Sequence, residues 1–307
     1  MESDSPTVAR RRVRLALREA REAAGCTQQQ LAEKMEWSLS KVIRIENGDV
    51  SISPTDLRPM LNFLGIKDQK TVSALVADAR TARTRQRRAW HQQPEFREQL
   101  PYGMRLLIEY EADALVARYY SALFLPDLLQ TDTYAARLSE AEAHQRFAQW
   151  RRAVPQALEF RRQALLSRQP PADIRVLLDE SVLRRTVGGA DIMADQLRQL
   201  RRWATDRVLR IRMYPFSVDA VVIDYPAFDL VSLGADDRQT VLYPENCAAD
   251  EINEDAGTTS HYRDRFDQMW NTAVPEEGSL DFIQNRIEYL EAVSGYRRKA
   301  AEVHHID

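Results

Sequence analysis

Residues 27–48 read TQQQLAEKMEWSLSKVIRIENG, a pattern that predicts two short helices joined by a tight turn. The first helix begins at Thr27, whose hydroxyl can cap the backbone, and Gln30, three residues later, completes a capping box. Ser38 is a preferred N-cap residue for the second helix. Gly48 can end that helix because glycine readily adopts a left-handed conformation. Local chemistry therefore fixes the boundaries of both helices.

Apolar residues in this stretch recur at helical spacing, which predicts one buried face on each helix. The inward-facing set comprises Leu31, Met35, Val42 and Ile45. Ser40 and Arg44, four residues apart, share the opposite face, and Lys41 lies beside them. The second helix of the pair thus presents a polar and basic face to solvent.

The whole stretch resembles the helix-turn-helix of the lambda-repressor-like, or XRE, family of transcriptional regulators. The family's glutamine appears as Gln28, its Leu-Ala pair as Leu31-Ala32, and its closing Ile-Glu-Asn-Gly as residues 45–48. The resemblance implies a five-helix DNA-binding domain. In such a domain the third helix lies in the major groove of double-stranded DNA while the second crosses the backbone.

The motif points to seven candidate DNA-contacting residues. These are Gln28, Ser38 and Asn47 for phosphates, Ser40, Lys41 and Arg44 for base edges, and Leu39 for a thymine methyl if it is exposed. The positive end of a helix favours a phosphate at Gln28, and the guanidinium of Arg44 matches O6 and N7 of guanine. Taken singly, Gln28 could be an ordinary surface residue and Arg44 a solvated charge. The complete motif favours DNA contact.

Three more helices are expected around the motif. They cover residues 8–24, a segment beginning at Ser53-Pro54, and a segment beginning near Asp68. Arginines cluster at both ends of this region, at positions 10, 11, 12 and 14 and at positions 80, 83, 85, 87 and 88. The first cluster could reach phosphates as an N-terminal arm. The second is at least as well explained as a solvated linker or as partners for acidic residues.

Composition excludes several classes of protein. The 307 residues are 44% apolar and 29% charged, which is ordinary for a globular chain of about two domains. Two cysteines cannot form a disulfide framework. The N-terminus has no apolar secretory region, and the apolar run at 114–129 is interrupted by Arg118 and Pro126. We therefore expect a cytoplasmic protein with no membrane association.

Charge is divided unevenly along the chain. Residues 1–90 contain 17 basic and 11 acidic residues, a net charge of +6, whereas residues 91–307 contain 26 and 35, a net charge of −9. A basic first part suits a polyanionic partner. The region around Gln92-Gln93-Pro94 is the best boundary, so we predict a DNA-binding domain at 1–90 and a second domain at 91–307.

Residues 91–307 alternate between strand and helix patterns, which predicts a mixed domain of helices around a small β-sheet. Strands are expected at 116–120, 174–178 and 209–214 and in AVVIDY, FDLVSL and TVLY between 220 and 243. Helices are expected after a cap at Thr131 or Asp132, at 143–168, 179–185, 190–204 and 261–274, and after a cap at Ser279. The whole chain is then α+β and mainly α.

No catalytic or metal-binding set can be identified in the sequence. The five histidines show no ligand spacing beyond the terminal His304-His305, and Cys247 has no neighbouring Cys or His. Neither a Gly-x-Ser-x-Gly elbow nor a P-loop occurs. The acidic run 249–255 lacks calcium-loop spacing, and Asp179-Glu180 suits a helix start. We expect no enzyme activity, no cofactor and no metal.

A second resemblance covers most of residues 100–290. FLPDLLQTDTYAARL, at 124–138, resembles the PGLLQT-x-x-YA segment of a C-terminal domain of unknown function that accompanies XRE modules in high-G+C bacteria. RRQALL, LLDESVLRRTVGG and QLRQL follow in the same order, and Asp127 replaces the usual glycine. The resemblance implies a domain that receives a signal or binds a small protein partner or small-molecule ligand.

Two functions follow from these patterns. The first is a sequence-specific DNA-binding transcriptional regulator, acting as a homodimer because one helix reads only a few base pairs. The alternative is an antitoxin-like interaction protein that neutralises or senses a small partner through residues 91–307, with DNA binding secondary. The acidic second part and its resemblance motivate this alternative.

Overall fold

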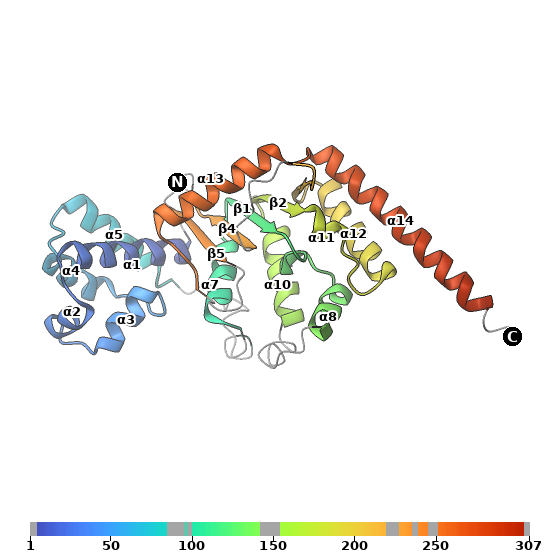
Figure 1. The fold of residues 1–307 in the computed structure, drawn as a ribbon. Helices are drawn as coiled ribbons and strands as arrows, with labels where there is room; N and C mark the ends of the chain where they lie inside the picture. Colours follow the sequence, from blue (N-terminus) through green and yellow to red (C-terminus); the bar gives the residue numbers. More distant parts are fainter. Residues whose placement is uncertain are drawn as a thin grey trace. The chain divides into compact units, whose positions relative to one another are not determined.

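The computed structural model of the chain describes residues 5–84, 96, 100–141, 154–218, 227–234, 239–244 and 251–303. The chain divides into two compact units, Met1–Ala89 and Trp90–Asp307 (Figure 1). We call the first unit the head and the second the body. The expected boundary segment around residues 92–94 lies outside the described residues.

The head consists of the five expected helices. They are α1 (Pro6–Ala23), α2 (Gln28–Lys34), α3 (Leu39–Asn47), α4 (Pro54–Phe63) and α5 (Gln69–Thr81). Each helix start is capped by a side chain that accepts the backbone N–H of the residue three positions later. The capping residues are Ser5, Thr27, Ser38, Ser53 and Asp68 in turn. These short polar residues cap helices because their oxygens reach the donors that the first turn leaves unpaired. The helix positions are therefore encoded locally.

One apolar core holds the head together. Leu31, Val42 and Ile45 are buried in it, as the spacing predicts, together with Leu17 from α1 and Leu57 from α4. Met35, Cys26 and Trp37 are partly buried and pack against the same core. The buried faces of α2 and α3 are thus held against this core, and their opposite faces are available for contacts with another molecule.

The body is built on a mixed five-stranded sheet. The strands are β1 (Val116–Ser121), β2 (Asp173–Asp179), β3 (Arg210–Tyr214), β4 (Phe228–Ser232) and β5 (Thr240–Pro244), in the order β3-β2-β1-β4-β5. β1, β2 and β3 are parallel, whereas β4 and β5 add antiparallel strands beside β1. The strands expected in these segments are confirmed. The expected AVVIDY strand at 220–225 lies outside the described residues.

Helices surround this sheet. They are α7 (Tyr102–Glu111), the short 3-10 helix η2 (Asp127–Leu129), α8 (Asp132–Ala141), α10 (Val154–Leu166), α11 (Glu180–Arg184), α12 (Ala190–Thr205), α13 (Ala256–Thr272) and α14 (Glu276–Val303). Phe266 and Trp270 of α13 pack on Phe228 and Leu230 of the sheet, and α14 runs beside α12 (Figure 1). The α+β, mainly α fold is confirmed.

Three helix predictions need correction or restriction. α13 begins at Ala256, capped by Asp255, five residues before the expected start. α14 begins at Glu276, so Ser279 is not its cap. Ser279 is instead buried, where its hydroxyl donates to the Val274 carbonyl and accepts the Met213 N–H, both at 2.9 Å. Of the long helix expected at 143–168, the structure describes α10, and residues 142–153 lie outside it.

Candidate nucleic-acid interface

The α2–α3 pair is a rigid frame in which each boundary has an identifiable cause. Thr27 Oγ1 accepts the Gln30 N–H at 3.2 Å, and Gln30 Oε1 accepts the Thr27 N–H at 2.8 Å. Ser38 Oγ accepts the Lys41 N–H at 3.3 Å. Gly48 ends α3 at φ +89°, and a Cβ built there would lie 3.1 Å from Cδ and Nε of Arg14. The left-handed conformation therefore favours glycine, and a larger residue would also require the Arg14 side chain to shift by a few tenths of an ångström.

The outer face of α3 carries most of the predicted DNA-contacting residues. Ser38, Leu39, Ser40, Arg44 and Asn47 are exposed, with Leu39 at 39%. Within the described part of the chain, the side chains of Ser40 and Arg44 form no hydrogen bond or ion pair. Arg44 can therefore extend toward a base edge without breaking a contact inside the head.

Lys41 is placed differently from its neighbours on α3. Its Nζ lies 3.4 Å from the centroid of the Trp37 ring and 3.6 Å from Asp56 Oδ2. The cation–π contact and the ion pair hold the ammonium to one side of the exposed face. Lys41 would have to give up these contacts to reach a base, so Arg44 is the better placed cation.

Gln28 belongs to a polar network that the sequence did not reveal. Its Nε2 donates to Glu46 Oε2 at 2.8 Å, and Glu46 is 1% exposed. Arg21 binds the same carboxylate through two nitrogens, Nε to Oε1 at 2.6 Å and a terminal nitrogen to Oε2 at 3.0 Å. The hydrogen bond to Glu46 raises the pKa of Arg21. The network joins α1, the start of α2 and the end of α3.

The network leaves Gln28 able to bind a phosphate. An amide nitrogen has two N–H donors, and the bond to Glu46 uses one of them. Gln28 is half-buried at the N-terminus of α2, where the helix end favours an anion. Glu46 and Arg21 thus position the side chain that the motif assigns to the DNA backbone.

The first arginine cluster does not form an N-terminal arm. Arg10, Arg11, Arg12 and Arg14 all lie within α1. Arg11 and Arg14 are buried, and Arg12 makes a bidentate contact with Asp78, at 3.0 and 2.7 Å. The helical pattern at 8–24 includes these residues, and side chains on a packed helix cannot reach out as an arm. Of the second cluster, Arg80 and Arg83 are described and positions 85, 87 and 88 are not.

The body contains a buried charge cluster on one face of its sheet. Arg161 of α10 binds Glu111 of α7 through two nitrogens, at 2.6 and 2.7 Å, and Asp229 of β4 at 3.2 Å. Tyr119 donates to Glu111 at 2.6 Å. Two carboxylates share one guanidinium, and burial raises the pKa of Asp229 to about 7. Sequence patterns missed this cluster because its members are far apart along the chain.

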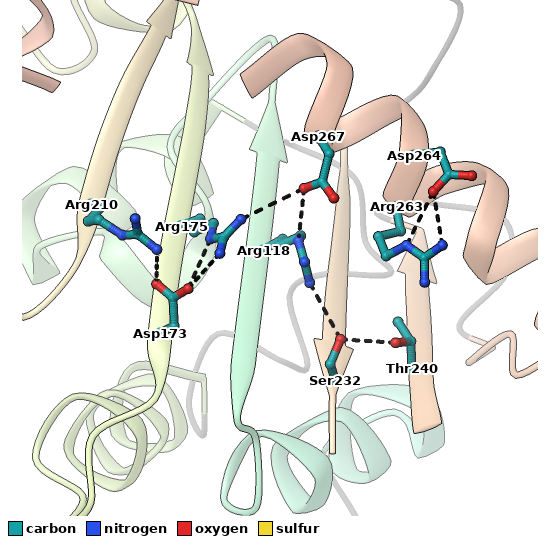
Figure 2. A network of polar contacts seen from close by, with 9 residues as sticks. All are labelled: Arg118, Asp173, Arg175, Arg210, Ser232, Thr240, Arg263, Asp264 and Asp267. Atoms are coloured by element: carbon teal, nitrogen blue, oxygen red, sulfur yellow. Dashed lines mark hydrogen bonds and ion pairs between the residues drawn. The ribbon is translucent and has the colours of Figure 1, made fainter. Parts of the chain in front are cut away.

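A second polar network lies on the other face of the sheet (Figure 2). Strand register places Arg118, Arg175 and Arg210 side by side on β1, β2 and β3. Asp173 contacts Arg175 and Arg210, and Asp267 of α13 forms ion pairs with Arg118 and Arg175 at 3.4 and 3.8 Å. Each arginine in the row therefore faces at least one carboxylate, and the network ties α13 to the sheet.

The described residues contain no group of three His, Cys, Asp or Glu side chains suited to a metal ion. His91, His144, His304, His305 and Cys247 lie outside them. Likewise, no helix in the described ranges has the length and apolar character needed to cross a membrane.

Comparison with known protein families gives two matches. A family model described as a helix-turn-helix domain matches residues 13–75, which contain the α2–α3 frame. A second, described as Domain of unknown function (DUF5753), matches residues 104–285, more than half of the chain. No curated protein and no solved structure matches the chain. The two matches confirm both resemblances found in the sequence.

Proposed function

Because the chain belongs to the DUF5753 family and carries a DNA-binding helix-turn-helix domain before it, we propose that it is a sequence-specific regulator of transcription. The observation that carries the proposal is the outer face of α3. Ser40 and Arg44 are exposed there on a helix whose two ends are fixed by Ser38 and Gly48. A rigid helix with an uncommitted arginine suits reading of the major groove.

The residues divide into two roles. Arg44 reads a guanine and Ser40 a neighbouring base edge, while the exposed Leu39 meets a thymine methyl. Gln28, Ser38 and Asn47 contact phosphates and fix the register of the helix on the duplex. Lys41 contributes after release from Trp37 and Asp56, or acts through its charge alone.

The proposal extends to assembly and to the body. One α3 helix reads only a few base pairs, so useful specificity requires a homodimer on two half-sites about one helical turn apart. The body receives a signal or binds a partner that changes DNA occupancy, and it has no catalytic activity. The protein works in the cytoplasm. The antitoxin-like alternative has no separate observation in its favour and stays a prediction.

The test compares specific with non-specific binding by the full chain. A labelled fragment from upstream of its own gene and a random fragment of equal length are titrated at several salt concentrations. Arg44→Ala should lower the preference for the specific fragment by roughly tenfold to a hundredfold and leave random DNA almost unaffected. Equal affinity of the wild-type chain for both fragments would contradict the proposal.

Two further variants locate the docking face. Gln28→Ala should weaken both fragments by a similar factor, because a phosphate contact carries no sequence information. Arg58→Ala is a matched control, since Arg58 is an exposed arginine on α4. If Arg58→Ala impairs specific binding as strongly as Arg44→Ala, the face assigned to DNA is wrong.

A further inference from the structure

Two apolar side chains protrude at one edge of the body. Leu123 follows β1 and is 61% exposed, and Phe216 follows β3 and is 62% exposed. They are the most exposed large apolar side chains among the residues that the structure describes. β1 and β3 belong to the parallel part of the sheet, so both side chains lie beyond the same strand ends.

Helix α11 connects the two protruding loops. The Phe216 N–H donates to Glu180 Oε2 at 2.9 Å, and the Ser181 hydroxyl donates to the Ala122 carbonyl. Glu180 and Ser181 form the first turn of α11. Leu123 and Phe216 therefore flank one short helix and belong to a continuous surface.

Three arginines and three aromatic rings complete this surface. Arg184 lies over Phe282 at 5.3 Å, Arg185 over Phe124 at 5.6 Å, and Arg286 over Tyr289 at 4.9 Å. Arg286 also donates to the Arg184 carbonyl at 2.6 Å, which joins α14 to α11. We call the set the α11 surface; it comprises Leu123, Phe124, Arg184, Arg185, Phe216, Phe282, Arg286 and Tyr289.

The arginines of the α11 surface are short of carboxylates. Glu180 pairs with Arg184, but within the described ranges no carboxylate pairs with Arg185 or Arg286. Burial lowers the pKa of Arg286, and the nearby charge of Arg184 acts in the same direction. In the network on the sheet, by contrast, clustered arginines pair with a carboxylate: Asp173 forms ion pairs with Arg175 and Arg210. An incomplete charge balance next to exposed apolar groups is typical of an interface.

We propose that the α11 surface binds a segment of a partner protein in which acidic side chains alternate with apolar ones. Carboxylates of the segment pair with Arg185 and Arg286, and its apolar side chains cover Leu123 and Phe216. This inference rests on the proposed partner-binding role of the body and names the chemistry of that partner.

A nucleic acid fits the α11 surface less well. The second part of the chain has a net charge of −9, which repels a long polyanion but acts weakly on a short segment with a few carboxylates. A phosphate backbone also offers nothing apolar to cover an aliphatic Leu123. The mixture of cationic and apolar groups is complementary to an acidic and apolar peptide.

The test uses a displayed library of short random peptides as its probe and the full chain as bait. Selected peptides should be enriched in Asp and Glu between Leu, Ile, Phe or Trp. Arg185→Glu and Phe216→Ser should each weaken a selected peptide about tenfold or more. Selection of basic peptides, or of none above background, would overturn the proposal.

Matched variants separate this surface from the rest of the body. Arg201→Glu reverses an exposed arginine on α12, and Leu115→Ser removes an apolar side chain that is 47% exposed before β1. Both should leave peptide affinity within about twofold of wild type. Equal losses of peptide affinity in these controls would overturn the assignment to the α11 surface. The proposal would also be overturned if Arg185→Glu lost binding to random DNA, or if it dissociated a dimer of the chain.

The outcome is separable from that of the proposed function. All four variants lie in the body and should bind upstream DNA through the head as the wild type does. If wild-type chain fails to distinguish upstream from random DNA, the regulator proposal fails whatever the peptides show. If it distinguishes them but Arg185→Glu and Phe216→Ser bind the selected peptides normally, this inference alone fails.

Discussion

Replacing Arg21 by alanine should destabilise the head strongly. Arg21 is the cation that compensates the Glu46 carboxylate, and the side chain of Glu46 is 2% exposed. Without Arg21 the carboxylate keeps the Gln28 amide, a neutral donor, at 2.8 Å. A buried carboxylate with a single neutral donor is unfavourable because its lost hydration is not replaced.

The magnitude follows from the burial of the pair. Removing one partner of a buried ion pair costs about 3–5 kcal/mol. The Arg21 side chain is itself 12% exposed and Gln28 remains, so we expect the lower end, about 3 kcal/mol. A domain of this size has roughly 4–12 kcal/mol of stability. The variant should therefore lose a large share of it, equivalent to a melting temperature lower by on the order of 15 °C.

Hydrogen exchange of backbone amides in α2 and α3 is the suitable assay. The chain has two compact units, so a melt of the whole chain can mix two transitions. Exchange followed by mass spectrometry reports on peptides from 27–48 alone. Arg21→Ala should accelerate their exchange by about a hundredfold, which is 3 kcal/mol by the usual conversion, whereas Arg58→Ala on α4 should change it little.

A double variant tests the physical cause. If the loss comes from an uncompensated charge, adding Glu46→Gln to Arg21→Ala should restore protection rather than reduce it further, because the buried group is then neutral. The argument would be refuted if Arg21→Ala alone lowered the free energy of unfolding by less than about 1 kcal/mol. Simple addition of the two losses in the double variant would refute it as well.

Three other changes have defined outcomes. Gly48→Ala should cost about 1–3 kcal/mol in a urea denaturation of the head, since φ is +89° and the new Cβ would press on Arg14. Burial raises the pKa of Asp229 from 3.8 to about 7. Between pH 3.8 and pH 7 the folded body therefore keeps a proton that the unfolded chain has released. The free energy of unfolding falls as pH rises through this range. The fall amounts to as much as about 4 kcal/mol, and Asp229→Asn should flatten it in urea midpoints measured from about pH 4 to pH 8. Ser279→Ala should cost about 1–3 kcal/mol and speed exchange of the Met213 amide, whose buried N–H loses the hydroxyl as its acceptor.

Sequence predicts those parts of the fold that depend on neighbouring residues. The capping box of Thr27 and Gln30 is complete within four residues, and the apolar spacing of α2 and α3 identifies their buried faces. The same holds in the body, where the hydroxyl of Thr131 accepts the Tyr134 N–H at 3.4 Å at the start of α8, as expected. For the site, exposure of Ser40 and Arg44 on α3 follows from helix geometry alone.

Contacts between distant residues could not be predicted in the same way. Arg21 and Glu46 are separated by 25 positions and Arg12 and Asp78 by 66. Many arginines of the chain could form such pairs, and only the packing of α1 against α3 and α5 selects among them. Ser279 illustrates a related failure. Its residue type suits an N-cap, but in the folded chain its hydroxyl accepts the N–H of Met213 on β3 instead.

These long-range contacts change the meaning of the charge distribution. The net charge of +6 over residues 1–90 favours attraction to DNA. Arg12 and Arg21 are not its source, because Asp78 and Glu46 compensate their charges. A cation paired at short range with an anion contributes little to the electrostatic field at a phosphate, because the two opposite charges nearly cancel there. Attraction to DNA therefore comes from cations without such a partner among the described residues, of which Arg44 is one, together with the N-terminus of α2. Such an arginine on the exposed face of α3 can contribute to specificity as well as to attraction, because it can contact base edges in the major groove.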